Sequence, residues 1–391
     1  MKIHTQHLVI AMSMAIALSA RAAVVFENSG TTSGWSYTSG DGSGTVTQVS
    51  SPTYRGSTAV KCYQTYSGSG DYTLHSECVK RDVGQNGQDR YYSWAFYLPT
   101  SWVDVSEGQV LTQLAADFTC CGGQQTDMLM VQNSGLYMHR MWGTAATQTN
   151  SSTLVASTVT KGTWHRVVLH KHWASDNTGV YQLWYDGNLV IDESGKPNAF
   201  VGTELYRWSI GLYANFRSFT GSRYDIVDQA RVTDNYDEAE PALWDGSTVD
   251  TTGVYQIQNG ASMLVLNNQG SLTNASKITQ WTTPNSSQNL QWKFIATDSG
   301  FYQINSVKSG KDAVVQSAST AAGAGIIQWT FGTAKNDQWL PVQNSDGSYT
   351  FYNRHSAMVL EDPGSSTSTS TQMDQWSANG GANQKWNLLL Q

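Results

Sequence analysis

The chain has 391 residues, which is more than one compact core usually holds, so we expect two or three domains. Only 14% of the residues are charged, whereas 35 are glycine, 15 tryptophan and 19 tyrosine. This balance excludes a disordered chain, which is charge-rich and poor in aromatic residues, and argues against a helical bundle. The net charge of −7 and the absence of a basic run argue against a nucleic acid or an anionic membrane as partner.

Residues 1–22 have the pattern of a secretory signal peptide. Lys2 precedes an apolar run over residues 8–18, and a small-x-small motif ends at Ala22. The apolar run has about eleven residues, which are too few to cross a bilayer that takes about 20. We therefore expect a secreted, extracellular protein that needs no membrane anchor.

Residues 23–245 alternate short strand-like segments with turns rich in Gly, Ser, Asn and Asp. Segments 91–97, 164–170 and 180–185 show this pattern, and Asp186-Gly187 after the last of them predicts a hairpin turn. No helical period is sustained in this region. We expect an all-β domain, a concanavalin-like β-sandwich or jelly roll.

Four cysteines follow the signal peptide: Cys62, Cys78, Cys120 and Cys121. Their spacing matches no zinc signature, so disulfides are the expected use in an oxidising compartment. A bond between the sequence neighbours Cys120 and Cys121 would be strained. Each of these two is therefore expected to pair with Cys62 or Cys78, and the connectivity stays open.

Residues 253–391 are repetitive, and 246–252 form the linker before them. A second tryptophan follows each of three Gln-Trp pairs, and these second tryptophans are spaced 47 residues apart at Trp292, Trp339 and Trp386. One such unit cannot bury its apolar face alone, but three can close a barrel. The repeat predicts a β-trefoil. We interpret the Gln-Trp tryptophans, Trp281, Trp329 and Trp376, as core residues.

Three strands of the first domain carry polar residues among apolar ones. His75 and Glu77 share one face of their strand, Gln113 is an isolated amide, and Tyr213 and Asn215 share a side. An imidazole, an amide and a phenol suit β-elimination from a uronic acid polymer, in which a proton leaves the carbon next to a carboxylate. The amide stabilises the developing enolate charge, and the other two groups move protons.

These segments resemble the jelly-roll polysaccharide lyases, the glucuronan lyases most and the alginate lyases more distantly. The matching motifs are His75-Ser76-Glu77, Gln113 and Gly211-Leu212-Tyr213, and the resemblance covers most of residues 24–245. It departs from the alginate lyases at Ala115, where they have a histidine, and at Trp208-Ser209-Ile210, where they have a lysine. The resemblance implies that Gln113 neutralises the carboxylate, His75 is base or neutraliser, and Tyr213 is acid or acid/base.

Further residues are expected to contact substrate or metal. Arg140, Lys171, Tyr206 and Asn215 are candidates for binding the substrate, since Arg and Lys suit anionic sugars. The resemblance to sandwich enzymes also implies a structural calcium ion held by Glu27 and Asp228, whose hard oxygens suit that metal. No organic cofactor motif is present, so we expect none.

The repeats resemble the ricin-B-type lectin domain used as a carbohydrate-binding module, most clearly at Asn383-Gln384-Lys385-Trp386. The sugar-binding aspartate of that family falls near three valines, Val265, Val314 and Val359. Polar neighbours are expected to take over its role: Asn267, Gln316, Glu361 and Asp362.

The sequence as a whole predicts a secreted, monomeric polysaccharide lyase that cleaves a β-1,4-linked polyuronate, glucuronan first, to 4,5-unsaturated products. One alternative is a glycoside hydrolase on a similar sandwich. A hydrolase that retains the anomeric configuration would require two carboxyl groups about 5–5.5 Å apart. Glu77 is the only candidate for such a group on a central strand. Another alternative is a non-catalytic lectin with two sugar-binding domains.

Overall fold

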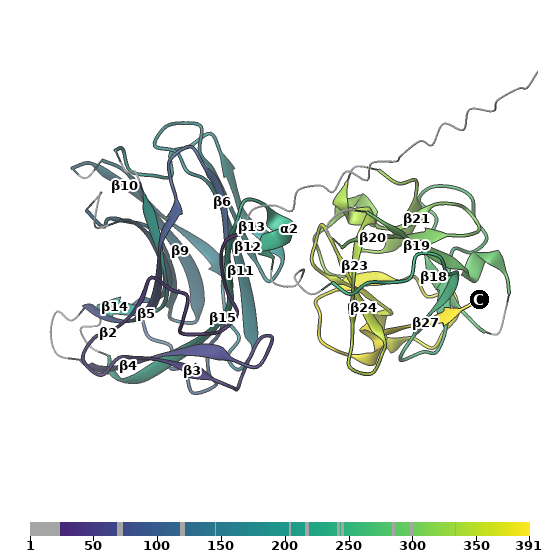
Figure 1. Cartoon of the computed structure of the whole chain (residues 1–391), viewed down its shortest axis with the longest axis horizontal. Helices are drawn as coiled ribbons and strands as arrows, with labels where there is room; N and C mark the ends of the chain where they lie inside the picture. Colours follow the sequence, from purple (N-terminus) through teal and green to yellow (C-terminus); the bar gives the residue numbers. More distant parts are fainter. Residues whose placement is uncertain are drawn as a thin grey trace, which may run out of the picture.

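The computed structural model describes residues 24–68, 73–117, 122–144, 146–202, 205–215, 219–240, 243, 246–283, 286–297, 300–332 and 334–391. The expected signal peptide, Cys120 and Cys121 lie outside these residues. Figure 1 shows a β-sandwich, drawn purple to teal, followed by a smaller β-rich body, drawn green to yellow. The predicted all-β fold is confirmed. No helix in the described part of the chain is long and apolar enough to cross a membrane.

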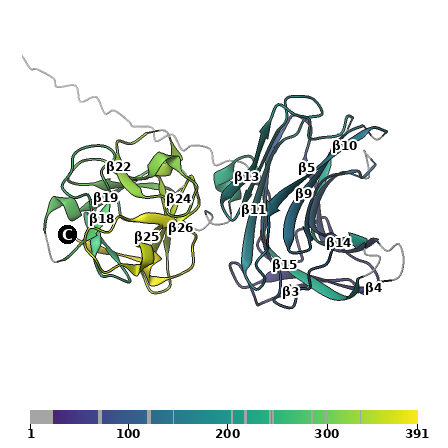
Figure 2. The same ribbon diagram turned by 180° about the vertical axis from the view of Figure 1, so that it is seen from behind.

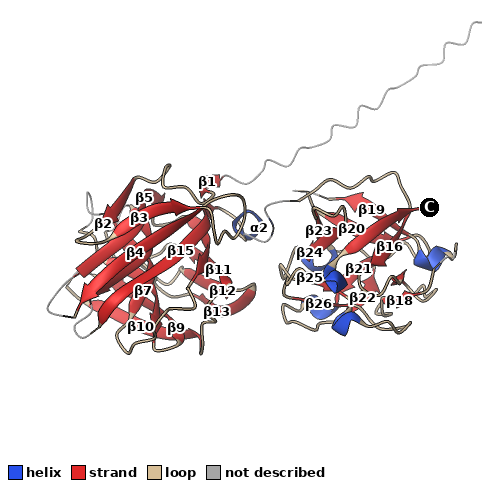
Figure 3. Ribbon diagram, turned by 90° about the horizontal axis from the view of Figure 1, so that it is seen from below, coloured by secondary structure: helices blue, strands red, loops and turns tan. Residues whose placement is uncertain are grey.

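The sandwich consists of two antiparallel sheets. The first has the order β13 (Asn188–Ser194), β12 (Val180–Tyr185), β11 (Trp164–His172), β6 (Asp89–Tyr97), β15 (Thr220–Thr233), β4 (Ala59–Ser67), β3 (Thr45–Val49), with β1 (Val24–Asn28) beside β15. The second has the order β10 (Gln148–Ala156), β9 (Gly135–Gly143), β8 (Gln125–Gln132), β7 (Gln109–Ala116), β14 (Tyr206–Asn215), β5 (Thr73–Gly84), β2 (Tyr37–Gly40). Figure 3 shows the strands of the sandwich running side by side.

Side chains of β14 alternate between the core, which lies between the two sheets, and the outer face of the second sheet. Trp208, Ile210 and Leu212 are buried in the cluster between the sheets, where the ring of Trp208 contacts that of Trp94 edge-on at 5.6 Å. Because successive side chains point to opposite faces of a strand, the intervening residues of β14 face away from this core. That outer face carries the candidate site.

Cys62 on β4 and Cys78 on β5 are fully buried free thiols that contact each other across the two sheets. Neither Cys62 nor Cys78 therefore forms the disulfide that was expected with Cys120 or Cys121. Free cysteine behaves as a small apolar residue, and these two fill the core in that way.

A short helix, α2 (Tyr236–Ala239), leads from the sandwich toward the second domain, which Figure 2 shows from behind. That domain contains β16 (Tyr255–Asn259), β17 (Val265–Asn267), β18 (Thr279–Trp281), β19 (Trp292–Ala296), β20 (Tyr302–Ser306), β21 (Asp312–Val315), β22 (Ile326–Trp329), β23 (Trp339–Gln343), β24 (Tyr349–Asn353), β25 (Val359–Glu361), β26 (Asp374–Trp376) and β27 (Trp386–Leu390). Its 3₁₀ turns are η2 (Gln288–Leu290), η3 (Gln316–Ala318), η4 (Lys335–Asp337), η5 (Pro363–Ser365) and η6 (Ala382–Gln384).

Three equivalent tryptophans make the core of this domain. Trp292, Trp339 and Trp386 are fully buried. Their indole Nε1 atoms donate to the carbonyl oxygens of Leu266, Ala313 and Leu360 at 3.1, 2.8 and 3.1 Å. The three-fold pattern satisfies each buried indole N–H in the same way, which buried polar groups require. The predicted β-trefoil is confirmed.

The tryptophans of the Gln-Trp pairs lie on the surface, so their interpretation as core residues is wrong. Trp281, Trp329 and Trp376 are 38, 45 and 43% exposed, while the preceding glutamines are fully buried. Gln328, for example, donates from Nε2 to the carbonyls of Ser271 and Thr273 in the neighbouring repeat. The glutamine therefore joins the repeats, and strand alternation turns the tryptophan outward.

Candidate active site

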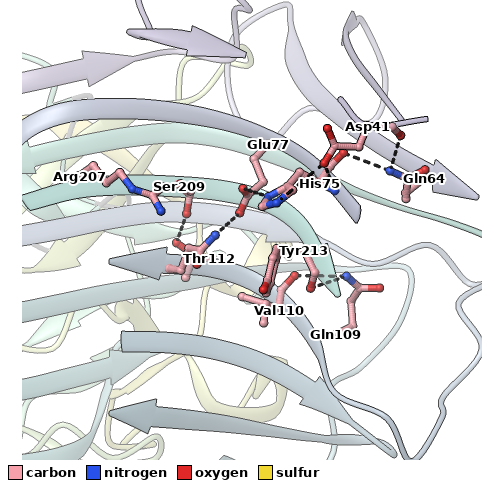
Figure 4. A network of polar contacts seen from close by, with 11 residues as sticks. Asp41, Gln64, His75, Glu77, Gln109, Val110, Thr112, Arg207, Ser209 and Tyr213 are labelled. Atoms are coloured by element: carbon pink, nitrogen blue, oxygen red, sulfur yellow. Dashed lines mark hydrogen bonds and ion pairs between the residues drawn. The ribbon is translucent and has the colours of Figure 1, made fainter. Parts of the chain in front are cut away.

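An open cleft of about 380 Å³ lies on the outer face of the second sheet, over β2, β5, β7 and β14. Its described lining is made of polar and aromatic side chains: Tyr37, Ser39, Asp41, His75, Glu77, Val79, Gln113, Gln125, Arg207 and Tyr213. The three expected catalytic residues, His75, Gln113 and Tyr213, are all among them. Figure 4 shows the polar network at the centre of this cleft.

His75 and Tyr213 are direct partners on adjacent strands. They face each other in the register between β5 and β14, and their ring centroids are 4.7 Å apart. Directly opposed residues of an antiparallel pair place their side chains on the same face of the sheet. The imidazole is therefore beside the phenol, with the His75 side chain 30% exposed to the cleft.

Glu77 connects the imidazole to the amide. The Glu77 carboxylate is buried, and Oε2 lies 3.0 Å from His75 Nδ1. Its other oxygen, Oε1, accepts a hydrogen bond of 3.0 Å from Gln113 Nε2. Since a carboxylate only accepts, His75 carries its proton on Nδ1 toward Glu77, which leaves Nε2 as the nitrogen that can take a proton.

Two opposing effects set the pKa of His75. Partial burial lowers the pKa, but the hydrogen bond and the negative charge of Glu77 raise it, and Asp41 adds to the increase. The net shift is upward from the ordinary value. A histidine with a raised pKa is a stronger base for removing a proton from substrate.

Gly211 is required where β14 passes the buried thiols. Its φ is +125°, a conformation that residues with a Cβ rarely adopt. A Cβ at this position would also lie 2.3 Å from the Ser76 carbonyl oxygen and 2.7 Å from Cys62 Sγ. The glycine therefore allows β14 to approach β5 closely, two residues before Tyr213.

Gln113 is 2% exposed, yet it lines the cleft. Its Nε2 is held by Glu77, and its Oε1 has no hydrogen-bond partner among the described residues. A buried amide oxygen without a partner costs free energy, so such groups are exceptions with a reason. Because an amide nitrogen carries two N–H groups, Gln113 Nε2 keeps one donor beyond the one that Glu77 accepts, whereas Oε1 can only accept.

Sequence reasoning missed Arg207, Tyr37 and Gln125, which also line the cleft. Arg207 is on the same face of β14 as Tyr213, six residues away, so the two-residue period of a strand contained the signal for it. Tyr37 and Gln125 come from β2 and β8, and only the pairing of distant strands brings them here.

Three of the four expected substrate-binding residues lie elsewhere. Arg140 makes a bidentate ion pair with Glu193, 3.0 Å from NH2 to Oε1, away from the cleft. Lys171 is fully buried against Asp127, with Nζ 2.7 Å from Oδ2. Their charges are used inside the protein, so the expected roles are wrong for both.

Tyr206 is also a core residue. Its ring stacks on Trp173 at 3.6 Å between centroids, and its hydroxyl donates to Asn86 Oδ1 at 2.8 Å. Even-numbered positions of β14 face the core, so the expected substrate contact is wrong. The side chain of Asn215 lies outside the described part of the chain.

Glu27 and Asp228 do not fit the calcium site that the resemblance implies. Glu27 Oε1 accepts a 2.8 Å bond from Arg231 NH2. Asp228 Oδ2 accepts from the backbone N–H groups of Tyr54 and Arg55 at 2.9 and 3.2 Å. These donors occupy oxygens that would have to coordinate a cation.

The expected sugar-binding residues of the trefoil are not equivalent. Asn267, Val314 and Glu361 each follow the residue whose carbonyl binds a core tryptophan, so these three correspond to one another. Val314 is therefore not equivalent to Val265 and Val359. Asn267 Oδ1 accepts a 2.8 Å bond from Asn289, and Glu361 accepts from Gln384.

Only Gln316 of the four expected residues lines a described cavity, which is about 600 Å³ in volume and includes Trp329 and Phe331. Asp362 is fully buried. Burial raises the pKa of Asp362 to about 6, which suits a carboxyl away from solvent better than a surface ligand. The middle repeat therefore offers an opening of about 600 Å³ beside Trp329.

The fold and the cleft define a two-domain carbohydrate-active protein. The sequence profile described as "Polysaccharide lyase" matches residues 27–239, and the chain belongs to this family. The sandwich domain is therefore that of a polysaccharide lyase. The profile described as "Ricin-type beta-trefoil lectin domain-like" matches residues 241–329, 288–376 and 335–390. No curated protein matches the chain.

Solved structures include similar ones for each domain. An endo-β-1,4-glucuronan lyase from the fungus Trichoderma reesei is 30% identical, with a TM-score of 0.53 over 56% of this chain and 99% of its own. The designed three-fold symmetric protein ThreeFoil is 32% identical, with a TM-score of 0.34 over 35% of this chain and 98% of its own. An endo-β-galactosidase from Clostridium perfringens is 13% identical, with a TM-score of 0.32 over 88% of both chains.

Proposed function

We propose that the protein is a secreted lyase that cleaves β-1,4-linked glucuronan by β-elimination. The observation that carries the proposal is the chain of contacts from Gln113 through Glu77 to His75 and on to Tyr213. These contacts bring together the amide, base and acid that elimination from a uronate needs. Similarity of the sandwich to a solved glucuronan lyase supports glucuronan as the substrate.

The first step is removal of the C5 proton. His75 Nε2 takes this proton, and the Glu77 carboxylate stabilises the imidazolium that forms, as the carboxylate of a catalytic triad does. The C5–H electron pair becomes negative charge shared with the neighbouring carboxylate. The second N–H of Gln113 Nε2, beyond the one that Glu77 accepts, donates to that carboxylate and stabilises the enolate-like charge.

The second step breaks the glycosidic bond. The electron pair on C5 forms the C4=C5 double bond while the C4–O4 bond breaks, and Tyr213 donates its hydroxyl proton to the leaving O4. The products are a new non-reducing end with a 4,5 double bond and a free hydroxyl on the other fragment. No water molecule is consumed, and His75 and Tyr213 recover their starting states by exchange of a proton.

The acids in the cleft favour elimination over hydrolysis. Glu77 and Asp41 are the carboxylates among the described lining residues. The His75 ring stands between them, with Nδ1 3.0 Å from Glu77 and Nε2 3.8 Å from Asp41. A retaining glycosidase holds the scissile bond between its two carboxyl groups, and here an imidazole occupies that place.

The trefoil would keep the enzyme on its polymer. An exposed tryptophan in each repeat and the cavity at Trp329 suit stacking against sugar rings. Weak sites are sufficient, because tethering raises the local concentration of the enzyme on a polymer.

The test is incubation with glucuronan, alginate and a neutral glucan while ultraviolet absorbance of the new double bond is followed. We expect absorbance with glucuronan and none with the neutral glucan. New reducing ends without absorbance would indicate hydrolysis. If no polymer gives either signal, the non-catalytic lectin becomes the favoured alternative.

A further inference from the structure

The charge balance of the cleft singles out Arg207. Two carboxylates, Glu77 and Asp41, line the cleft, and a polyuronate brings one more with every sugar. Arg207 is the only arginine or lysine among the described lining residues, and a guanidinium stays charged at every relevant pH. Without Arg207 the cleft would carry excess negative charge and would repel the polymer that the proposed function assigns to it.

The neighbours of Arg207 direct its guanidinium over the sheet. Arg207 pairs with Ala115 in the register between β14 and β7, and its NH1 donates a 3.1 Å bond to Ser209 Oγ. The side chain is only 5% exposed, so its charge acts in surroundings with little water. Ala115 and Ser209 are both small, and they leave room for a long side chain to lie across their positions.

Arg207 also lies near the reacting groups. Ser209 is the β14 partner of Gln113, so the residue that Arg207 contacts is directly opposite the amide. The positive charge of Arg207 lowers the pKa of His75, which places the two within electrostatic reach. A uronate carboxylate held by Gln113 would therefore meet the guanidinium on the same side of the cleft.

We propose that Arg207 binds the carboxylate of the uronate in the cleft and makes cleavage depend on a charged sugar. This inference rests on the proposed function. A planar guanidinium binds a carboxylate through two parallel N–H···O bonds, and burial strengthens the attraction.

The test compares Arg207→Met and Arg207→Lys with wild type on glucuronan and on methyl-esterified glucuronan, which has no charge. Hydrogen bonds to charged groups predict that Arg207→Met raises the KM for glucuronan about 10–100-fold. Arg207→Lys keeps the charge but loses the paired geometry, so its KM should lie between the other two. On the ester, the three proteins should differ far less.

Arg90→Met is the matched control, because it removes the same charge from β6 in the other sheet and should leave KM unchanged. Thermal melting of each variant shows whether it folds, and if Arg207→Met does not, the KM of Arg207→Lys decides. A KM within twofold of wild type in the folded Arg207 variants would overturn the inference, as would an equal loss on the ester. If wild type makes no unsaturated product from glucuronan, the proposed substrate fails instead, and the same comparison is run on the polyuronate that it does cleave.

Discussion

His75 and Tyr213 are cross-strand partners whose ring centroids lie 4.7 Å apart on the face of the sheet that forms the cleft. A sugar ring that enters above them meets a base and an acid on neighbouring strands. Strands of one sheet hold their side chains in fixed register, so the spacing between the two groups does not depend on a mobile loop.

Replacing either partner should stop turnover without unfolding the protein. His75→Ala removes the base and Tyr213→Phe removes the acid, and each should lower kcat by about 10²–10⁴-fold. Absorbance of the unsaturated product measures the loss, and circular dichroism confirms the fold. Tyr137→Phe, on β9 of the same sheet but outside the cleft, should keep normal activity. Normal rates in His75→Ala or Tyr213→Phe would remove that residue from the mechanism.

Glu77→Gln should shift the pH dependence of turnover. Glu77 raises the pKa of His75, so in the native enzyme the base becomes neutral, and kcat/KM rises, only above the ordinary value of 6.5. Without the carboxylate the pKa falls, and the acid limb of the pH profile should move to lower pH while the maximal rate drops. An acid limb at the same pH in both proteins would contradict the role given to Glu77.

The raised pKa of His75 also affects the stability of the folded protein, but this contribution falls as pH rises, whereas activity increases. Because the folded pKa of His75 is raised, its protonated form favours the folded state. That contribution is complete below the unfolded pKa of about 6.5 and disappears as pH rises through the folded value. Urea unfolding of wild type and His75→Ala at a series of pH values should show a difference that shrinks as pH increases through this window.

Lys171→Met should destabilise the protein and not simply weaken substrate binding. The substitution leaves the Asp127 carboxylate buried without its cation, and breaking a buried ion pair in this way costs about 3–5 kcal/mol. Urea unfolding measures the loss, and Lys171→Met with Asp127→Asn should recover part of it. A stable Lys171→Met protein with a raised KM would restore the role that the sequence suggested.

Trp329→Ala should weaken attachment to insoluble polymer. Trp329 is 45% exposed and lines the largest described cavity of the trefoil, whereas Trp281 and Trp376 do not line it. Retention in a pull-down should fall most for Trp329→Ala, while cleavage of short soluble substrate stays normal. Equal retention by all three alanine variants and wild type would exclude the tryptophans from binding.

The parts of the structure that could be predicted are those that leave a regular pattern in the sequence. The 47-residue spacing of Trp292, Trp339 and Trp386 revealed the trefoil, because each repeat needs the same buried indole. His75, Gln113 and Tyr213 were found because polar residues on apolar strands stand out and because their motifs resemble those of the polysaccharide lyases, and the structure brings all three into one cleft.

The wrong site predictions concern which face of a strand a residue occupies and which strands are neighbours. Sequence does not specify either when both faces of a strand are buried. β11 is buried on both faces from Val167 to Lys171 although basic residues are frequent in it, so Lys171 was taken for a substrate contact when its ion pair with Asp127 lies in the core. Tyr206 and Arg207 are adjacent on β14 but point to opposite sides. Counting back from Tyr213 in steps of two residues leads to Arg207, so this period would have identified Arg207 and not Tyr206 as the cleft residue.

Mass spectrometry of the fragments from glucuronan digestion tests β-elimination most directly. Elimination consumes no water, so we predict that every fragment with a newly formed non-reducing end is unsaturated and one water lighter than the hydrolysis product of the same length. Saturated sugars at all the newly formed non-reducing ends would show hydrolysis and contradict the proposed reaction.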